Sequence, residues 1–208
     1  MDTGSRTRAH AEAALVVALA AVLDFARIPL PYLLYGGSVS LEGLPLIVVG
    51  LRRGPAAGAV AGAVYGLVNL MLHPMVVHPA QVVLDYPLAY GLLGLGAGLS
   101  GGPAVRWGTV HRWQGHLRTA VGVLAGNAGR LLSHFVSGIA FFAAYAPPGQ
   151  AVWKYSLVYN GSYMLPQSLL QILLVPVVVR ILAQRAASAP VGRRGAGADR
   201  LARPGQQG

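Results

Sequence analysis

The sequence predicts an all-α membrane protein, built as a single bundle of six transmembrane helices, on three observations. Of its 208 residues, 54% are hydrophobic and 11% are charged, whereas soluble domains are nearer a quarter charged. Apolar runs recur along the chain, separated by short segments rich in Pro, Gly and Arg. The 28 glycines suit close helix packing in lipid, because small residues let two backbones approach each other.

The first predicted helix covers residues 9–26 and ends before Pro29, which cannot continue a helix. Arg6 and Arg8 precede it as they would in a signal peptide. No clean cleavage region follows, and further hydrophobic segments do, so we expect this helix to be retained. The second predicted helix, 41–51, is short for a bilayer, which needs about 20 apolar residues. We expect it to be partly re-entrant or joined to an ordered loop.

Four longer helices complete the predicted bundle. The third, 56–72, follows a tight turn at 51–55 and carries a GxxxGxxxG packing face made of Gly58, Gly62 and Gly66. The last three are predicted at 80–99, 117–145 and 153–185, with Pro166 and Pro176 kinking the final one.

The distribution of arginine predicts the topology. Six helices place both termini on one side, and most of the basic residues then fall on that side, which the positive-inside rule assigns to the cytoplasm. We therefore expect a cytoplasmic segment at 1–8, a transmembrane domain at 9–185 and a disordered, basic cytoplasmic tail at 186–208. The net charge of +10 then reflects topology and contact with anionic membrane lipid rather than nucleic-acid binding.

Polar and aromatic side chains gather in the apolar stretch 129–161. Intramembrane polar residues normally face the bundle interior or a wet cavity, so we interpret them as one wall of a small-molecule site. Interhelical hydrogen bonds with an interfacial aromatic belt are the alternative. One helix face presents Arg130, His134, Gly138, Phe141 and Tyr145, and the next presents Tyr155, Tyr159, Tyr163, Gln167 and Gln171, with Asn160 beside it.

Two of the six acidic residues complete the predicted site. Glu42 opens the second helix, where it could instead serve only as a charge on the helix dipole. Asp85, followed by Tyr86, lies inside an apolar helix and needs a cation or hydrogen-bond donors as partners. Acids beside aromatic faces suit an organic cation, through charge pairing and cation–π contact.

No catalytic motif emerges, so the sequence predicts neither an enzyme nor a bound cofactor. His73 and His78 are each followed by proline, which favours a shaped loop over a metal site. Nucleotide-binding motifs are absent too, so the chain alone cannot use ATP. Ala14 and Ala18 give the first helix a smooth face, either for internal packing or for docking another membrane protein.

Four segments together resemble the thiamine-specific S component of energy-coupling factor transporters. They are LEGLPLIVVGLRRGPAAGAVAGAVYG (41–66), LDYPLAY (84–90), HFVSGIAFF (134–142) and YSLVYNG (155–161). Their order and spacing match over nearly the whole chain outside the tails. The combination is specific, whereas any one segment alone is weak.

The resemblance implies an S-component-type bundle in a bacterial cell membrane that captures thiamine from outside. It would dock on a transmembrane coupling protein and two ATPase subunits, and toppling in the membrane would deliver the vitamin inward. Docking is implied for Ala14 and Ala18, and ring stacking for Tyr65 and Phe142. The remaining implied site residues are Glu42, Asp85, Tyr86, Arg130, His134, Tyr155 and Asn160.

The chain departs from the family pattern at several positions, and Tyr65 and Phe142 stand at stacking positions where Trp is common. Asp85 stands where Glu is common, Arg130 stands where Lys is common, and an aromatic residue near Ser38 is lost. An S component for another vitamin or for a thiamine precursor is therefore the alternative. A stand-alone secondary carrier is a weaker one, because the sequence has no clear inverted repeat.

Overall fold

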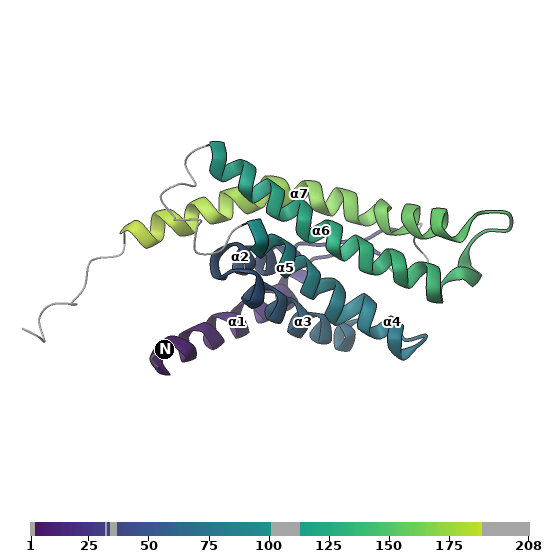
Figure 1. The fold of residues 1–208 in the computed structure, drawn as a ribbon, viewed down its shortest axis with the longest axis horizontal. Coiled ribbons are helices and arrows are strands. Elements are labelled where there is room, and N and C mark those ends of the chain that lie inside the picture. Colours follow the sequence, from purple (N-terminus) through teal and green to yellow (C-terminus); the bar gives the residue numbers. More distant parts are fainter. Residues whose placement is uncertain (1–2, 32, 34–36, 101–112, 189–208) are drawn as a thin grey trace, which may run out of the picture.

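The described part of the chain forms six helical rods. The structure, a computed structural model, describes residues 3–31, 33, 37–100 and 113–188 (Figure 1). Part of the predicted basic loop, 101–112, and the predicted tail after Ser188 lie outside the described residues. The elements are α1 (Thr3–Asp24), β1 (Ile28–Pro29), β2 (Ser38–Val39), α2 (Gly43–Arg53), α3 (Pro55–Leu72), α4 (Pro79–Val83), a π-helical turn η1 (Leu84–Leu88), α5 (Ala89–Ser100), α6 (Trp113–Phe141), a 3₁₀ turn η4 (Ala143–Tyr145) and α7 (Val152–Ser188).

The six predicted helices are confirmed, with small differences at their ends. Because α4, η1 and α5 follow one another without a break, they form a single rod. Helix α1 starts at Thr3, before the predicted 9, and α6 stops at Phe141 instead of 145. Among the described residues, three helices are long and apolar enough to cross a bilayer: Pro55–Leu72, Pro79–Ser100 and Val152–Arg185.

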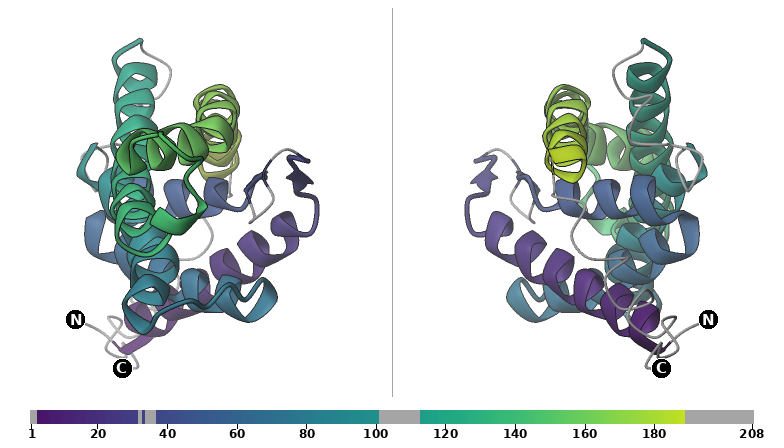
Figure 2. Two further views of the ribbon diagram at one scale, coloured as in Figure 1. Left: turned by 90° about the vertical axis from the view of Figure 1, so that its right-hand side faces the viewer. Right: turned by 90° about the vertical axis from the view of Figure 1, so that its left-hand side faces the viewer.

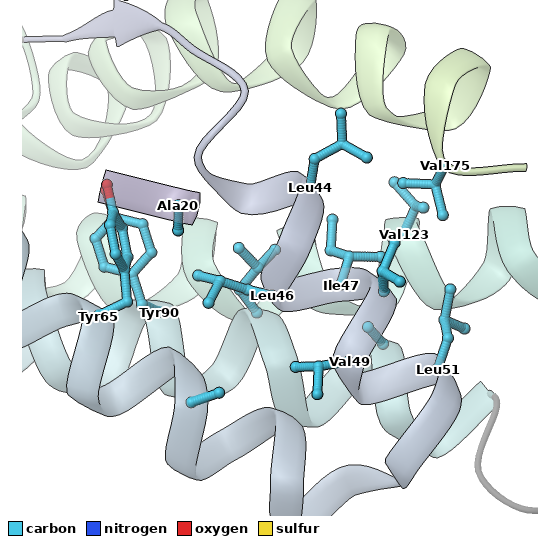
Figure 3. Packing of buried hydrophobic residues seen from close by; sticks show 14 of the residues in the cluster. Ala20, Leu44, Leu46, Ile47, Val49, Leu51, Tyr65, Tyr90, Val123 and Val175 are labelled. Atoms are coloured by element: carbon cyan, nitrogen blue, oxygen red, sulfur yellow. The ribbon is translucent and has the colours of Figure 1, made fainter. Parts of the chain in front are cut away.

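The short helix α2 lies at the centre of the bundle. Every residue from Gly43 to Leu51 is buried, and Leu46 and Ile47 are among the largest fully buried side chains (Figure 3). A helix that is apolar all round belongs inside a protein. Because α2 is buried within the bundle, its 11 residues do not have to span a bilayer. The antiparallel pair of β1 and β2 precedes it.

Figures 1 and 2 show how the other helices surround α2. The long helices α6 and α7 pack side by side, while α1 and α3 pack together elsewhere in the bundle. Helix α5 packs against α2, α3 and α6. The first turn of α1 and the last turns of α7 lie toward one end of the molecule, and the α6–α7 connection lies toward the other (Figure 1).

Glycine lets α3 approach the rod of η1 and α5 very closely. A Cβ atom on Gly62 would overlap the carbonyl oxygen of Tyr90, and one on Gly66 would overlap that of Tyr86. The predicted GxxxGxxxG packing face is therefore confirmed. Because both glycines face the backbone of tyrosines, this contact also sets the position of the Tyr86 and Tyr90 side chains. The sharp α2–α3 turn depends on Gly54, whose φ of 95° favours glycine.

Candidate small-molecule binding site

A cavity of about 220 Å³ opens between the helices, and side chains from most elements line it. Eight of the nine residues assigned to the site from the sequence lie in its wall. They are Glu42, Asp85, Tyr86, Arg130, His134, Phe142, Tyr155 and Asn160. Residues far apart in the chain thus meet at one place. Glu42 is the N-cap of α2, Asn160 lies on α7, and the other six lie between them in the sequence.

Glu42 and Arg130 form a buried ion pair on one wall of the cavity. The Arg130 Nη1 atom donates to Glu42 Oε1 at 3.1 Å, and the two side chains are 6% and 3% exposed. Gln167 Nε2 donates to the same oxygen at 3.0 Å. The second oxygen, Glu42 Oε2, is buried without a hydrogen-bond partner in the described part of the chain.

Glu42 is more than a charge on the helix dipole, because side chains of other helices bind its carboxylate. Although Glu42 occupies the N-cap of α2, its side chain makes no capping hydrogen bond. Arg130 is held in turn by Tyr90, which accepts from Nη2 at 3.1 Å and lies under the guanidinium with its ring centroid 4.4 Å away. The carboxylate is thus aimed by side chains of α5, α6 and α7.

Asp85 forms a second polar cluster, on the η1 turn. Its Oδ1 atom pairs with His134 Nδ1 at 3.0 Å, and its Oδ2 atom accepts from Gln81 Nε2 at 2.7 Å and from Ser137 Oγ at 2.9 Å. An ionised carboxylate can only accept, so the proton of this hydrogen bond lies on His134 Nδ1, and in the neutral form of the ring Nε2 is then an acceptor. That Nε2 atom is buried without a partner among the described residues.

The local backbone explains how Asp85 reaches the cavity. Pro87 lies inside η1 and has no N–H to continue an α-helical ladder. The rod widens there into one π-helical turn, a feature frequent at functional sites. Asp85 and Tyr86 lie inside this turn, and both line the cavity.

Tyr86 holds the loop that follows α3. Its hydroxyl donates to the carbonyl oxygen of His73 at 2.8 Å and accepts from the backbone N–H of Met75 at 2.8 Å. Gln81 binds the same loop through the Met75 carbonyl oxygen at 3.1 Å. The Tyr86 ring therefore faces the cavity while its hydroxyl is engaged by the protein.

An aromatic wall from α6 and α7 closes the other side. Tyr155, Tyr159 and Tyr163 follow one another at successive turns, with ring centroids 5.7 and 6.5 Å apart. The Tyr163 hydroxyl donates to Asn160 Oδ1 at 2.9 Å. Phe142 reaches the cavity because α6 ends just before it.

Tyr65 is the predicted site residue that the structure does not bring into the wall. Its side chain is fully buried, and its ring packs edge-on against Tyr90 at 4.8 Å (Figure 3). A ring in this position supports Tyr90 from behind and does not stack on a molecule in the cavity. Trp153, near the start of α7, is 56% exposed and is not part of the wall.

Several lining residues were missed by sequence reasoning. Tyr90 follows Tyr86 by one helical turn, and Gln81 precedes Asp85 by one turn, so their spacing alone could have found them. Asp24 and His73 come from the ends of α1 and α3, and no local pattern in the sequence brings these two ends together.

The described lining carries more acid than base. It holds the carboxylates of Asp24, Glu42 and Asp85, and the guanidinium groups of Arg27 and Arg130. With neutral histidines, this leaves an excess of one negative charge. Unpartnered acceptors beside an aromatic wall and a net negative lining suit a cationic heteroaromatic molecule that can donate hydrogen bonds.

Comparison with known proteins places the chain in a family. A family model described as thiamine transporter protein matches residues 10–187. The chain belongs to this thiamine transporter family. Its members are transporters, so the family agrees with the prediction that the chain is not an enzyme.

Individual members of the thiamine transporter family support the assignment. Thiamine transporter ThiT of Bacillus subtilis is 35% identical over 158 residues, which cover 74% of this chain and 81% of that protein. Thiamine transporter ThiT of Lacticaseibacillus paracasei is 34% identical over 182 residues, which cover 83% and 87%. A solved structure of ThiT from Listeria monocytogenes has a TM-score of 0.73 at 24% identity, covering 86% of this chain and 97% of that chain, so the bundle fold is shared.

Proposed function

We propose that the chain binds thiamine in the described cavity and is the substrate-binding component of an energy-coupling factor importer. The observation that carries this proposal is the pair of buried acceptors, Glu42 Oε2 and His134 Nε2, in a cavity with an excess negative charge. Relatives of similar length are named thiamine transporters, which supports the same ligand.

The chemistry of thiamine matches the wall of the cavity. Its aminopyrimidine ring offers an amino group that donates hydrogen bonds, and Glu42 Oε2 and His134 Nε2 are acceptors that lack a donor in the described chain. Its thiazolium ring is a permanent cation, and the tyrosine wall presents π faces to such a charge. A site that hydrogen-bonds its ligand rejects analogues that lack those groups.

Binding by the purified chain tests the ligand. Isothermal titration in detergent, without ATP, is expected to give saturable one-to-one binding of thiamine. The same titration with other B vitamins and with the pyrimidine precursor separates the alternatives. If another vitamin binds and thiamine does not, the chain serves a different substrate.

The exposed face of α1 supports docking on a coupling protein. Ala14 and Ala18 are both exposed, so they do not pack inside this chain, and Leu15 beside them is 71% exposed. Small residues at four-residue spacing let another membrane helix approach closely. An Ala18→Trp substitution is expected to abolish ATP-dependent uptake in cells while thiamine binding by the purified variant is unchanged. Equal uptake by this variant and the unaltered chain would exclude docking at this face.

Uptake without ATPase subunits tests the stand-alone carrier. Proteoliposomes containing only this chain are expected to bind thiamine without accumulating it. Accumulation driven by an ion gradient would instead identify a secondary carrier.

Because the chain has no cysteine, single cysteines introduced near each end also test the proposed cytoplasmic termini by labelling in intact cells.

A further inference from the structure

The hydroxyl group of Tyr90 lies between Arg130 and Glu42, in the wall of the cavity. Tyr90 is in the first turn of α5 and is 4% exposed. Its oxygen accepts from Arg130 Nη2 at 3.1 Å and donates a long hydrogen bond to Glu42 Oε1 at 3.5 Å. A tyrosine hydroxyl can do both at once, because it has one proton and two lone pairs. Since Arg130 Nη1 donates to the same Glu42 oxygen, the three side chains close a ring of polar contacts.

Helix α3 holds Tyr90 from behind at two points. The Tyr65 ring meets the Tyr90 ring edge-on, at 86° between the ring planes, and Figure 3 shows the two rings together. Gly62 lies against the backbone carbonyl oxygen of Tyr90, where a Cβ atom would overlap it. Because the backbone and the ring are both closely packed, the Tyr90 hydroxyl is a fixed point to which the cavity side chains adjust.

The planar guanidinium group of Arg130 matches this fixed point. One terminal nitrogen binds Glu42, the other binds Tyr90, and the Cζ atom lies 4.4 Å from the centre of the Tyr90 ring. The third nitrogen, Nε, is buried without a hydrogen-bond partner in the described part of the chain. A lysine ammonium is a point charge, and it cannot bind in two set directions and stack on a ring in the same way. Arg130 and Tyr90 therefore form a matched pair.

This pair determines how the Glu42 carboxylate is turned. Glu42 Oε1 accepts all the hydrogen bonds described for this carboxylate, whereas Oε2 is buried without a partner among the described residues. The last torsion of a glutamate side chain is broad, so the two oxygens keep their places only when something holds them. A group that is already held in its binding geometry loses less conformational entropy when a ligand arrives.

We propose that Tyr90 is a positioning residue for ligand binding. Through its hydroxyl and through Arg130 it fixes Glu42 Oε1, and so holds Glu42 Oε2 ready for a hydrogen-bond donor of the ligand. This inference rests on the proposed function, because it assigns to Tyr90 a part in binding the same ligand at the same site. It requires that Tyr90 and Arg130 act as one unit.

Calorimetric titration of thiamine with four chains tests this unit: the unaltered chain, Tyr90→Phe, Arg130→Lys and the double variant. Tyr90→Phe keeps the ring and removes only the hydroxyl, so affinity is expected to fall about tenfold, the effect of one hydrogen bond to a charged group. Arg130→Lys is expected to lose a similar factor. Because either change releases the same contacts, the double variant should also lose about tenfold, rather than the roughly hundredfold of independent changes.

Tyr65→Phe is the matched control. It makes the same change one ring behind Tyr90 and keeps that ring, and the oxygen that it removes accepts from Asn69 Nδ2 at 3.4 Å. Its affinity should equal that of the unaltered chain, and thermal melts without ligand show that each variant is folded. Unchanged affinity in folded Tyr90→Phe, or losses that multiply in the double variant, would overturn the positioning role. An equal loss in Tyr65→Phe would overturn it too, because any hydroxyl removed from this core would then loosen the cavity.

Failure of the proposed function is seen separately, as no binding of thiamine by the unaltered chain. The four titrations are then made with the vitamin or precursor that does bind. The Tyr90–Arg130 pair is thus tested apart from the identity of the ligand.

Discussion

Replacing Asp85 with asparagine tests how the second polar cluster works. The carboxylate accepts three hydrogen bonds, from His134 Nδ1, Gln81 Nε2 and Ser137 Oγ. An amide of the same size accepts at one atom and donates at the other. One side of the cluster must therefore place a donor against a donor, or His134 must change its tautomer.

The expected loss follows from these contacts. If His134 changes tautomer, Nε2 becomes a donor and no longer accepts from the amino group of the ligand. A hydrogen bond to a charged group contributes about 1.5–3 kcal/mol, so we expect thiamine affinity to fall roughly tenfold to hundredfold. The lining also loses one negative charge, which acts in the same direction on a cationic ligand.

Calorimetric titration of thiamine measures this change, with Glu12→Gln as the control for a carboxylate-to-amide change outside the cavity. A thermal melt without ligand shows whether the Asp85→Asn variant is folded. A folded Asp85→Asn variant with the affinity of the unaltered chain would refute the proposed role of Asp85 and the His134 tautomer argument.

Three further predictions concern the supporting structure. Gly62→Leu should destabilise the fold by about 1–3 kcal/mol, seen as a lower melting temperature, because its Cβ meets the Tyr90 carbonyl oxygen; an unchanged melt would contradict the close packing. Gln167→Leu should weaken thiamine binding about tenfold in the same titration, since Glu42 loses a donor; unchanged affinity would mean that Arg130 alone aims the carboxylate. Tyr86→Phe should speed amide hydrogen exchange in residues 73–78, measured by mass spectrometry, because the hydroxyl holds this loop; equal exchange would remove that role.

Much of the architecture could be predicted because lipid imposes simple rules on sequence. Apolar runs, prolines and the spacing of Gly58, Gly62 and Gly66 located the helices and one close packing face. The π-helical turn at Leu84–Leu88 could not be predicted in the same way. Pro87 signals a break in the ladder, but whether the helix kinks or widens depends on what packs against it.

The cavity wall was predicted where polar residues interrupt apolar helices. Asp85 and His134 stand out because a charged or polar group in lipid needs a partner. Tyr65 was predicted to stack on the ligand but lies outside the cavity wall. The sequence cannot separate these two cases, because an aromatic residue on a packing face looks the same whether it faces a ligand or another ring. The Asp24–His73 pair depends on two helix ends meeting in space, which is a property of the whole bundle.

A crystal structure of the chain grown with thiamine tests the central claim most directly. We predict density for the ligand inside the described cavity, with its amino group within hydrogen-bond distance of Glu42 Oε2 or His134 Nε2. Thiamine bound elsewhere on the bundle, with this cavity closed or filled by side chains, would contradict the account.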